Sequence, residues 1–130
     1  MYLLDTCTLI WLVSNQDALT NNVKKALRIN AGNLYISSIS AFEIAIKTVK
    51  GKIELPLSPD EWFKEAVKHH GIQEVPITSD IACKSVLLPR IHNDPCDRII
   101  MATAILENMF IITKDGIFSE YPDILISFNV

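Results

Sequence analysis

The sequence predicts an α/β fold, a three-layer sandwich in which helices cover a central, mostly parallel sheet on both faces. Two observations predict it. Short apolar runs of strand length alternate along the chain with longer segments whose apolar residues recur at helical spacing. The strand runs are short and apolar throughout, whereas a strand with one face in water would alternate apolar and polar residues. They are typical of parallel strands buried between helices.

The first strand and the first two helices follow directly from the N-terminus. Tyr2–Leu4 is a short apolar run, and an apolar helix is expected from about Thr6 to about Val13. A second helix is expected from about Ala18 to about Arg28, because its apolar residues share one stripe. Leu34–Ile36 then predicts the second strand.

Capping residues indicate the next two helices. A helix is expected from about Ala41 to about Val49, ending near Gly51, with Ser37, Ser38 and Ser40 as candidate N-caps. Ser58 followed by Pro59 places a serine at the N-cap and a proline at the first helical position. This helix is expected to continue to about His69.

The rest of the chain alternates in the same way, and turn or capping residues separate its elements. We expect, in order, a strand over Ile72–Ile77 interrupted by Pro76, a helix from Thr78 or Ser79 to about Leu88, a helix that begins at Asp94-Pro95 and runs to about Asn108, and strands over Met109–Thr113 and Ile124–Phe128. This alternation supports the parallel sheet.

The composition indicates one ordinary globular domain over residues 1–130. Hydrophobic residues make up 49% of the chain and charged residues 21%, which excludes a disordered segment. No stretch approaches the roughly 20 apolar residues that a membrane span needs, and the N-terminus lacks the features of a signal peptide. Three cysteines without a CxxC pair predict reduced thiols and a cytoplasmic protein. The formal net charge of -3 means that any nucleic-acid binding depends on a local basic patch.

Four carboxylates stand beside apolar segments that would ordinarily exclude them, namely Asp5, Glu43, Asp97 and Asp115. Asp5 and Asp115 directly follow expected strands, while Glu43 and Asp97 lie near the starts of expected helices. In open parallel sheets both positions fall at the edge where the strands end, which is where ligands bind. Like charges about 4 Å apart repel by about 4 kcal/mol at an effective dielectric near 20. A site that gathers these four residues therefore needs a cation.

Each acid also has an ordinary structural explanation. Asp5 is a preferred helix cap, and Asp115 lies in a turn-like segment. Glu43 has Lys47 four residues later and is a candidate for a surface pair, although it lies at the edge of the apolar stripe. Asp97 would favour the helix dipole, yet the residues three, four and seven positions on are apolar. The hypothesis of a site depends on all four acids occurring together.

These residues resemble the PIN-domain ribonucleases, particularly the VapC-type toxins of type II toxin–antitoxin systems. The resemblance covers nearly the whole chain, so residues 1–130 are expected to form a single PIN-like domain. Cys96 and Cys7 depart mildly from the family pattern and touch none of the four acids. The matching segments are Leu3-Leu4-Asp5-Thr6, Ser38-Ile39-Ser40-Ala41-Phe42-Glu43-Ile44, His92-Asn93-Asp94-Pro95-Cys96-Asp97-Arg98 and Thr113-Lys114-Asp115.

The resemblance implies a metal-dependent endoribonuclease that cuts single-stranded RNA and leaves 5′-phosphate and 3′-hydroxyl ends. It also implies a homodimer and a cognate antitoxin protein as partner. The catalytic and metal-binding residues would be Asp5, Glu43, Asp97 and Asp115, as direct or water-mediated ligands. Their hard oxygen donors favour Mg²⁺ or Mn²⁺ over zinc.

Residues near the acids are candidates for subsidiary roles. Three hydroxyl residues, Thr6, Ser38 and Thr113, are candidates for orienting the acids or binding phosphate, with helix capping or turn formation as the alternative. Five basic residues are candidates for the RNA-binding rim, with ordinary solvated surface charge as the alternative for each: Lys47, Lys50, Lys52, Arg98 and Lys114. Arg98 has the alternative of pairing with an acid. The histidines His69, His70 and His92 are expected to be surface or packing residues, and Trp11 is expected in the core.

Other functions fit the sequence less well. A haloacid-dehalogenase-like phosphatase needs a second Asp two positions after the first, where Cys7 stands. A response-regulator receiver needs an adjacent acidic pair and a phosphoacceptor Asp after a central strand, and neither is evident. A non-catalytic interaction domain with the PIN fold remains the main alternative, although such a domain has no reason to keep all four acids.

Overall fold

The computed structural model describes residues 1–129, and the side chains of residues 1–124. Five parallel strands form one sheet in the order β3-β2-β1-β4-β5. The strands are β1 Tyr2–Leu4, β2 Leu34–Ser37, β3 Gln73–Val75, β4 Phe110–Thr113 and β5 Leu125–Asn129. The fold class predicted from the sequence, a parallel sheet with connecting helices, is confirmed.

Six α-helices and two short 3₁₀ helices connect these strands within the described residues. The α-helices are α1 Thr6–Ser14, α2 Asn21–Ile29, α3 Ile39–Val49, α4 Pro59–His69, α5 Ser79–Leu87 and α6 Pro95–Glu107. The 3₁₀ helices are η1 Gln16–Ala18 and η2 Gly116–Glu120. None of the described helices is long and apolar enough to pass through a membrane.

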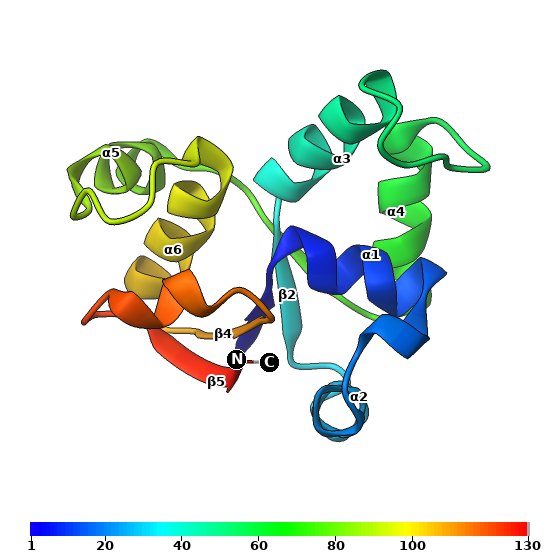
Figure 1. Cartoon of the computed structure of the whole chain (residues 1–130), viewed down its shortest axis with the longest axis horizontal. Coiled ribbons are helices and arrows are strands. Elements are labelled where there is room, and N and C mark those ends of the chain that lie inside the picture. Colours follow the sequence, from blue (N-terminus) through cyan, green and yellow to red (C-terminus); the bar gives the residue numbers. More distant parts are fainter. Residues whose placement is uncertain (130) are drawn as a thin grey trace.

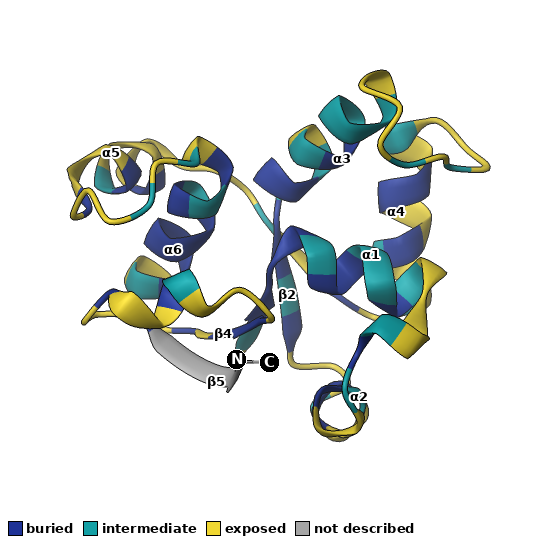
Figure 2. Ribbon diagram, viewed as in Figure 1, coloured by how far each residue is buried: buried dark blue, intermediate teal, exposed yellow. Residues whose placement is uncertain are grey.

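Helices α5 and α6 cover one face of the sheet, and α1 to α4 lie on the other side (Figure 1). Successive residues of a strand point to opposite faces, so β1 serves two cores. Leu3 packs with Ile100 and Met101 in one core cluster, whereas Leu4 packs with Leu9 and Trp62 in the other. Figure 2 shows that buried segments follow the central strands and parts of the helices that cover them. The three-layer sandwich is therefore confirmed.

Most expected elements occur with boundaries shifted by a few residues. The largest shift is in the second helix, expected from Ala18, which begins at Asn21 because the Thr20 hydroxyl caps it by accepting a hydrogen bond of 3.2 Å from the Val23 N–H. The expected strand over Ile72–Ile77 is reduced to the three residues of β3. The 3₁₀ helix η2 was not expected.

The strand register brings the ends of β1, β2 and β4 to one level. Leu4 pairs with Ile36 of β2 and with Ile112 of β4. Asp5, the residue directly after β1, donates its backbone N–H to the Ile112 carbonyl at 3.2 Å. Residues that follow these strands therefore meet at the same edge of the sheet, where helices α1 and α3 also begin.

Candidate active site

All four acids identified in the sequence line one cavity of ≈ 270 Å³ at the carboxyl edge of the sheet. Asp5 follows β1, Asp115 follows β4, Glu43 lies on α3 and Asp97 lies in the first turn of α6. Figure 1 shows α1, α3 and α6 arranged around this edge. The complete lining is Asp5, Thr6, Cys7, Trp11, Glu43, Asp97, Lys114 and Asp115.

Asp5 is the most deeply buried of the four acids, with 6% of its surface exposed. One carboxylate oxygen, Oδ1, accepts a hydrogen bond of 2.9 Å from the Thr8 N–H and so caps α1. The other oxygen, Oδ2, accepts a hydrogen bond of 2.6 Å from the Thr113 hydroxyl. Burial nevertheless raises the pKa of Asp5, because these hydrogen bonds only partly offset the loss of solvation. The residue is therefore both a helix cap and a buried charge at the site.

Thr113 connects the ends of β1 and β4. Its hydroxyl donates to Asp5 and also accepts a hydrogen bond of 3.0 Å from the Asp115 N–H. Asp115 itself is exposed and caps η2 by accepting a hydrogen bond of 3.1 Å from the Ile117 N–H. One hydroxyl thus holds the Asp5 side chain and the Asp115 backbone together, which matches the orienting role considered for Thr113.

Glu43 contributes a buried carboxyl oxygen, Oε1, that has no hydrogen-bond partner among the described residues. No ion pair with Lys47 forms within 4.0 Å, so the alternative explanation of Glu43 as half of a surface pair finds no support in the described part of the chain. A buried polar atom without a partner costs about 1–3 kcal/mol, and more when it is charged. A bound cation would remove this cost.

The helix that carries Glu43 is also linked to the first helix. The hydroxyls of Thr6 and Ser40 lie 2.8 Å apart and are both buried, which joins the start of α1 to the start of α3. Thr6 therefore helps to position two of the acid-bearing segments. Ser38, by contrast, donates its hydroxyl to the Glu74 carboxylate at 2.6 Å and does not line the acidic cavity.

Asp97 faces a histidine. The His92 Nε2 atom lies 2.7 Å from Asp97 Oδ2, and among the described residues no other side-chain nitrogen of Lys, Arg or His lies within 4.0 Å of a carboxylate oxygen. Burial raises the pKa of Asp97 to about 7; the contact with His92 opposes this rise, whereas the charges of Asp94 and Glu43 add to it. The same histidine forms a tight group with Asp94 and Asp97, whose ligand atoms lie within 4.8 Å of one another.

The four cavity acids are more widely spaced than this group, since no three of them bring ligand atoms within 4.8 Å of one another in the described structure. Three of them nevertheless lie close enough to Cys7 to affect its thiol. The pKa of the Cys7 thiol is raised to about 11, first by burial and then by the charge of Asp5, with Glu43 and Asp97 adding to the effect and Lys47 opposing it. Carboxylates from three separate elements therefore meet around Cys7.

The raised pKa of Asp97 predicts a pH-dependent stability. Its pKa is about 7 in the folded protein against an ordinary value of 3.8, so the folded state binds the proton more tightly between these values. The metal-free wild type should therefore lose stability as the pH rises across this window, and Asp97→Asn should lose less. Urea unfolding in EDTA at about pH 5 and about pH 8 measures both proteins. If the free energies of unfolding of the wild type and Asp97→Asn differ by the same amount at both pH values, the prediction is wrong.

The structure corrects one expectation about the rim and qualifies one about the core, because Trp11 packs against the core cluster without being fully buried. Arg98 does not lie at an RNA-binding surface, because only 6% of it is exposed and its guanidinium donates to five backbone carbonyls. It does not pair with an acid in the site either. Trp11, expected in the core, is only partly buried and lines the acidic cavity. Cys7 and Trp11 are four residues apart on α1, so helical spacing places them on one face of that helix.

The contact of His92 with Asp97 was not predicted, because nothing in the local sequence of His92 indicates that it faces this acid.

Three of the candidate rim lysines line a neighbouring cavity of ≈ 390 Å³, which shares Glu43 with the acidic cavity. They lie on α3 or shortly after it and are Lys47, Lys50 and Lys52. Lys114 lines the acidic cavity itself.

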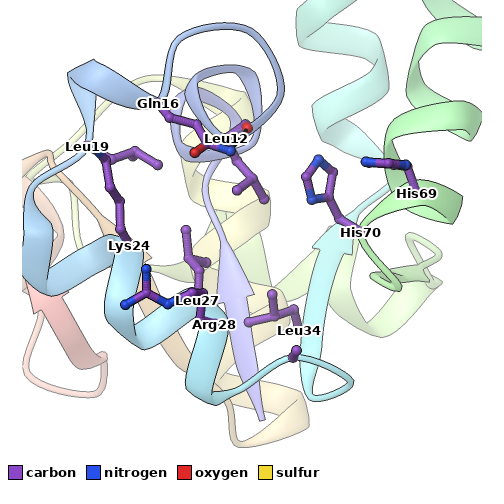
Figure 3. Close-up of a pocket in the computed structure, with 10 residues that line it drawn as sticks. Leu12, Gln16, Leu19, Lys24, Leu27, Arg28, Leu34, His69 and His70 are labelled. Atoms are coloured by element: carbon purple, nitrogen blue, oxygen red, sulfur yellow. Dashed lines mark hydrogen bonds between the residues drawn. The ribbon is translucent and has the colours of Figure 1, made fainter.

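A separate cavity of ≈ 360 Å³ lies at the opposite end of β2 and contains no carboxylate in its lining. Figure 3 shows leucines from α1, α2 and β2, among them Leu12, Leu27 and Leu34, together with Arg28 and His70. Its lining is apolar and basic, which differs from the acidic lining of the cavity at the carboxyl edge of the sheet.

Comparisons with known proteins agree with this architecture. The PIN domain family model matches residues 2–124, a span that includes all four acids. Ribonuclease VapC22 of Mycobacterium tuberculosis (strain ATCC 25618 / H37Rv) is 32% identical over 114 residues, covering 87% of this chain and 85% of that protein.

Solved structures show the same fold. The crystal structure of VapBC2 from Rickettsia felis bound to a DNA fragment from its promoter superposes with a TM-score of 0.72 at 17% identity, covering 97% of this chain and 96% of that chain. A toxin–antitoxin complex from Klebsiella pneumoniae gives a TM-score of 0.68 at 24% identity over 100% of both chains. The chain therefore belongs to the PIN domain family, among the VapC-type ribonucleases.

Proposed function

We propose that this protein is a metal-dependent endoribonuclease that cleaves RNA phosphodiester bonds and acts as the toxin of a toxin–antitoxin pair. The observation that carries the proposal is the buried, unpartnered Oε1 atom of Glu43 in a cavity lined by three further carboxylates. The similarity to a protein named as a ribonuclease supports RNA as the substrate.

The donor set suits Mg²⁺ or Mn²⁺. The residues that would hold the ion are Asp5, Glu43, Asp97 and Asp115, all of which offer hard carboxylate oxygens. Such an ion, when bound, supplies a Lewis acid that lowers the pKa of a coordinated water and offsets negative charge on the phosphate.

The chain's own residues prepare the site for this ion. Thr113 keeps Asp5 in one orientation by donating to its Oδ2 at 2.6 Å, and the contact between Thr6 and Ser40 keeps α1 and α3 together. His92 holds Oδ2 of Asp97 at 2.7 Å, which leaves Oδ1 of that carboxylate for a ligand. These contacts fix the ligands before a substrate arrives, so little reorganisation is needed when the ion binds.

The partner of the proposed toxin is a cognate antitoxin protein, and a homodimer is the expected assembly. The solved structure from Klebsiella pneumoniae, which has the same fold, is described as a toxin–antitoxin complex, and this supports such a partner.

A nuclease assay with metal removal tests the function. Purified protein is expected to cut single-stranded RNA with Mn²⁺ or Mg²⁺, to stop when EDTA is added, and to resume when excess ion is returned. Sequencing of the RNA ends should find 5′-phosphate and 3′-hydroxyl termini. Cleavage that continues at the same rate in EDTA would contradict metal dependence, and the absence of cleavage with either ion would favour a non-catalytic interaction domain.

A further inference from the structure

Lys114 is the only lysine or arginine in the lining of the acidic cavity. It follows β4 directly and stands between Thr113 and Asp115. Its ammonium nitrogen Nζ lies 5.1 Å from the centre of the Trp11 ring. Within the described residues, no carboxylate oxygen comes within 4.0 Å of this nitrogen, although four carboxylates share the cavity.

This arrangement differs from a simple surface lysine. An ammonium close to several carboxylates would ordinarily pair with one of them. Here it lies over an aromatic face, which attracts the cation without accepting its N–H groups as an oxygen would. Trp11 is partly buried and packs against the core cluster on the α1 side of the sheet, so the ring is a fixed support.

We propose that Lys114, held over Trp11, binds a phosphate oxygen of the RNA strand that enters the acidic cavity. This inference rests on the proposed function. RNA brings one negative charge per nucleotide to a cavity that is itself negative, so the strand needs a local cation to approach. Lys114 has the position for this role, since its N–H donors remain available and the Trp11 ring restricts where the ammonium lies.

The alternative role for Lys114 is to neutralise the cavity carboxylates in the absence of metal. That role requires contact with one of them, and the distances in the structure disfavour it. The two roles also differ in their consequences. A counter-ion for the acids would weaken metal binding to the site when present, whereas a phosphate-binding lysine would strengthen RNA binding.

Substitution of Lys114 distinguishes these roles. Lys114→Gln is expected to weaken the binding of a 5′-fluorescein single-stranded RNA roughly fivefold, the upper end for one exposed ion pair, whereas Lys114→Arg should stay near wild type. The dependence of log affinity on log salt should become shallower by about 0.7, the value for one contact to a single strand. Fluorescence anisotropy in EDTA measures binding without cleavage, and the salt dependence of kcat/KM with Mg²⁺ provides a second measurement.

The matched control is Lys25→Gln, which removes the same charge from an exposed position on α2 that is absent from the cavity lining. It should bind RNA as the wild type does. Trp11→Leu should weaken binding in the same direction as Lys114→Gln, and the double variant should be no weaker than Lys114→Gln alone, because both changes remove one coupled contact. Thermal unfolding confirms that each variant is folded.

Equal binding and equal salt dependence for Lys114→Gln and Lys25→Gln would overturn this inference. So would tighter Mn²⁺ binding by Lys114→Gln with unchanged RNA binding, which would identify Lys114 as a counter-ion for the acids. Neither result affects the proposed nuclease function, which fails only if the wild type does not cleave RNA with Mg²⁺ or Mn²⁺.

Discussion

Replacing Asp5 by Asn is expected to abolish RNA cleavage, with kcat/KM reduced by at least about a hundredfold, since even residues that only support metal ligands affect activity by about 10- to 100-fold. Asn keeps the Oδ1 acceptor that caps α1 through the Thr8 N–H at 2.9 Å. It replaces the Oδ2 oxygen, which accepts from Thr113 at 2.6 Å, with an amide nitrogen that cannot ligate a cation. The substitution therefore removes the charge and largely preserves the fold.

The same substitution should leave the metal-free protein at least as stable as the wild type. Burial raises the pKa of Asp5, so its ionised form is unfavourable in the folded state, and a neutral amide avoids this cost. Added Mg²⁺ or Mn²⁺ should raise the unfolding temperature of the wild type but not that of Asp5→Asn, because a ligand stabilises only the folded state that binds it. Loss of activity with retained stability is a result that a purely structural Asp5 would not produce.

Initial rates on a fluorogenic RNA and urea unfolding in EDTA measure these two effects. Asp17→Asn is the matched control, since Asp17 is exposed on η1 and outside the cavity. It should behave as the wild type in both assays. Cleavage by Asp5→Asn at the wild-type rate would exclude Asp5 from the metal site, and a large loss of stability would show that its Oδ2 oxygen, which accepts from Thr113, supports the fold.

The sheet and the convergence of the acids could be predicted from the sequence because both depend on local patterns. Apolar runs mark the strands, and the rule that parallel strands end at one edge places Asp5 and Asp115 together. Glu43 and Asp97 were found because they interrupt apolar stripes on helices. In the structure, all four acids line one cavity.

The contacts that support these acids could not be predicted in the same way. Thr113 and Asp5 are 108 positions apart, and their 2.6 Å hydrogen bond depends on the register of β1 and β4. The contact between His92 and Asp97 depends on the path of the loop before α6. Arg98 escaped prediction because its partners are backbone carbonyls, which carry no sequence signal.

Arg98 fixes the loop between α5 and α6. Its Nε donates to the Ser85 carbonyl at 2.9 Å, and its two terminal nitrogens donate to the carbonyls of Val86, Leu88, Pro89 and His92 at 2.8 to 3.2 Å. All five N–H donors of the guanidinium are therefore used. Several of these acceptors lie at the end of α5, where helix carbonyls lack partners within the helix. The loop they fix carries His92, which contacts Asp97.

Arg98→Met is therefore expected to lower the free energy of unfolding by about 3–5 kcal/mol. Five backbone carbonyls lose a charged donor, each such hydrogen bond contributes about 1.5–3 kcal/mol, and water recovers part of the total at the carbonyls that it can reach. Arg98→Lys should restore only part of this loss, because an ammonium has three donors and cannot reproduce the planar fork. Arg90→Met, at an exposed position in the same loop, is the control and should be close to wild type. Urea unfolding measures all three proteins. If Arg98→Met unfolds at the wild-type midpoint and instead changes the salt dependence of RNA binding, Arg98 would be a substrate contact and its buried network would be unimportant for stability.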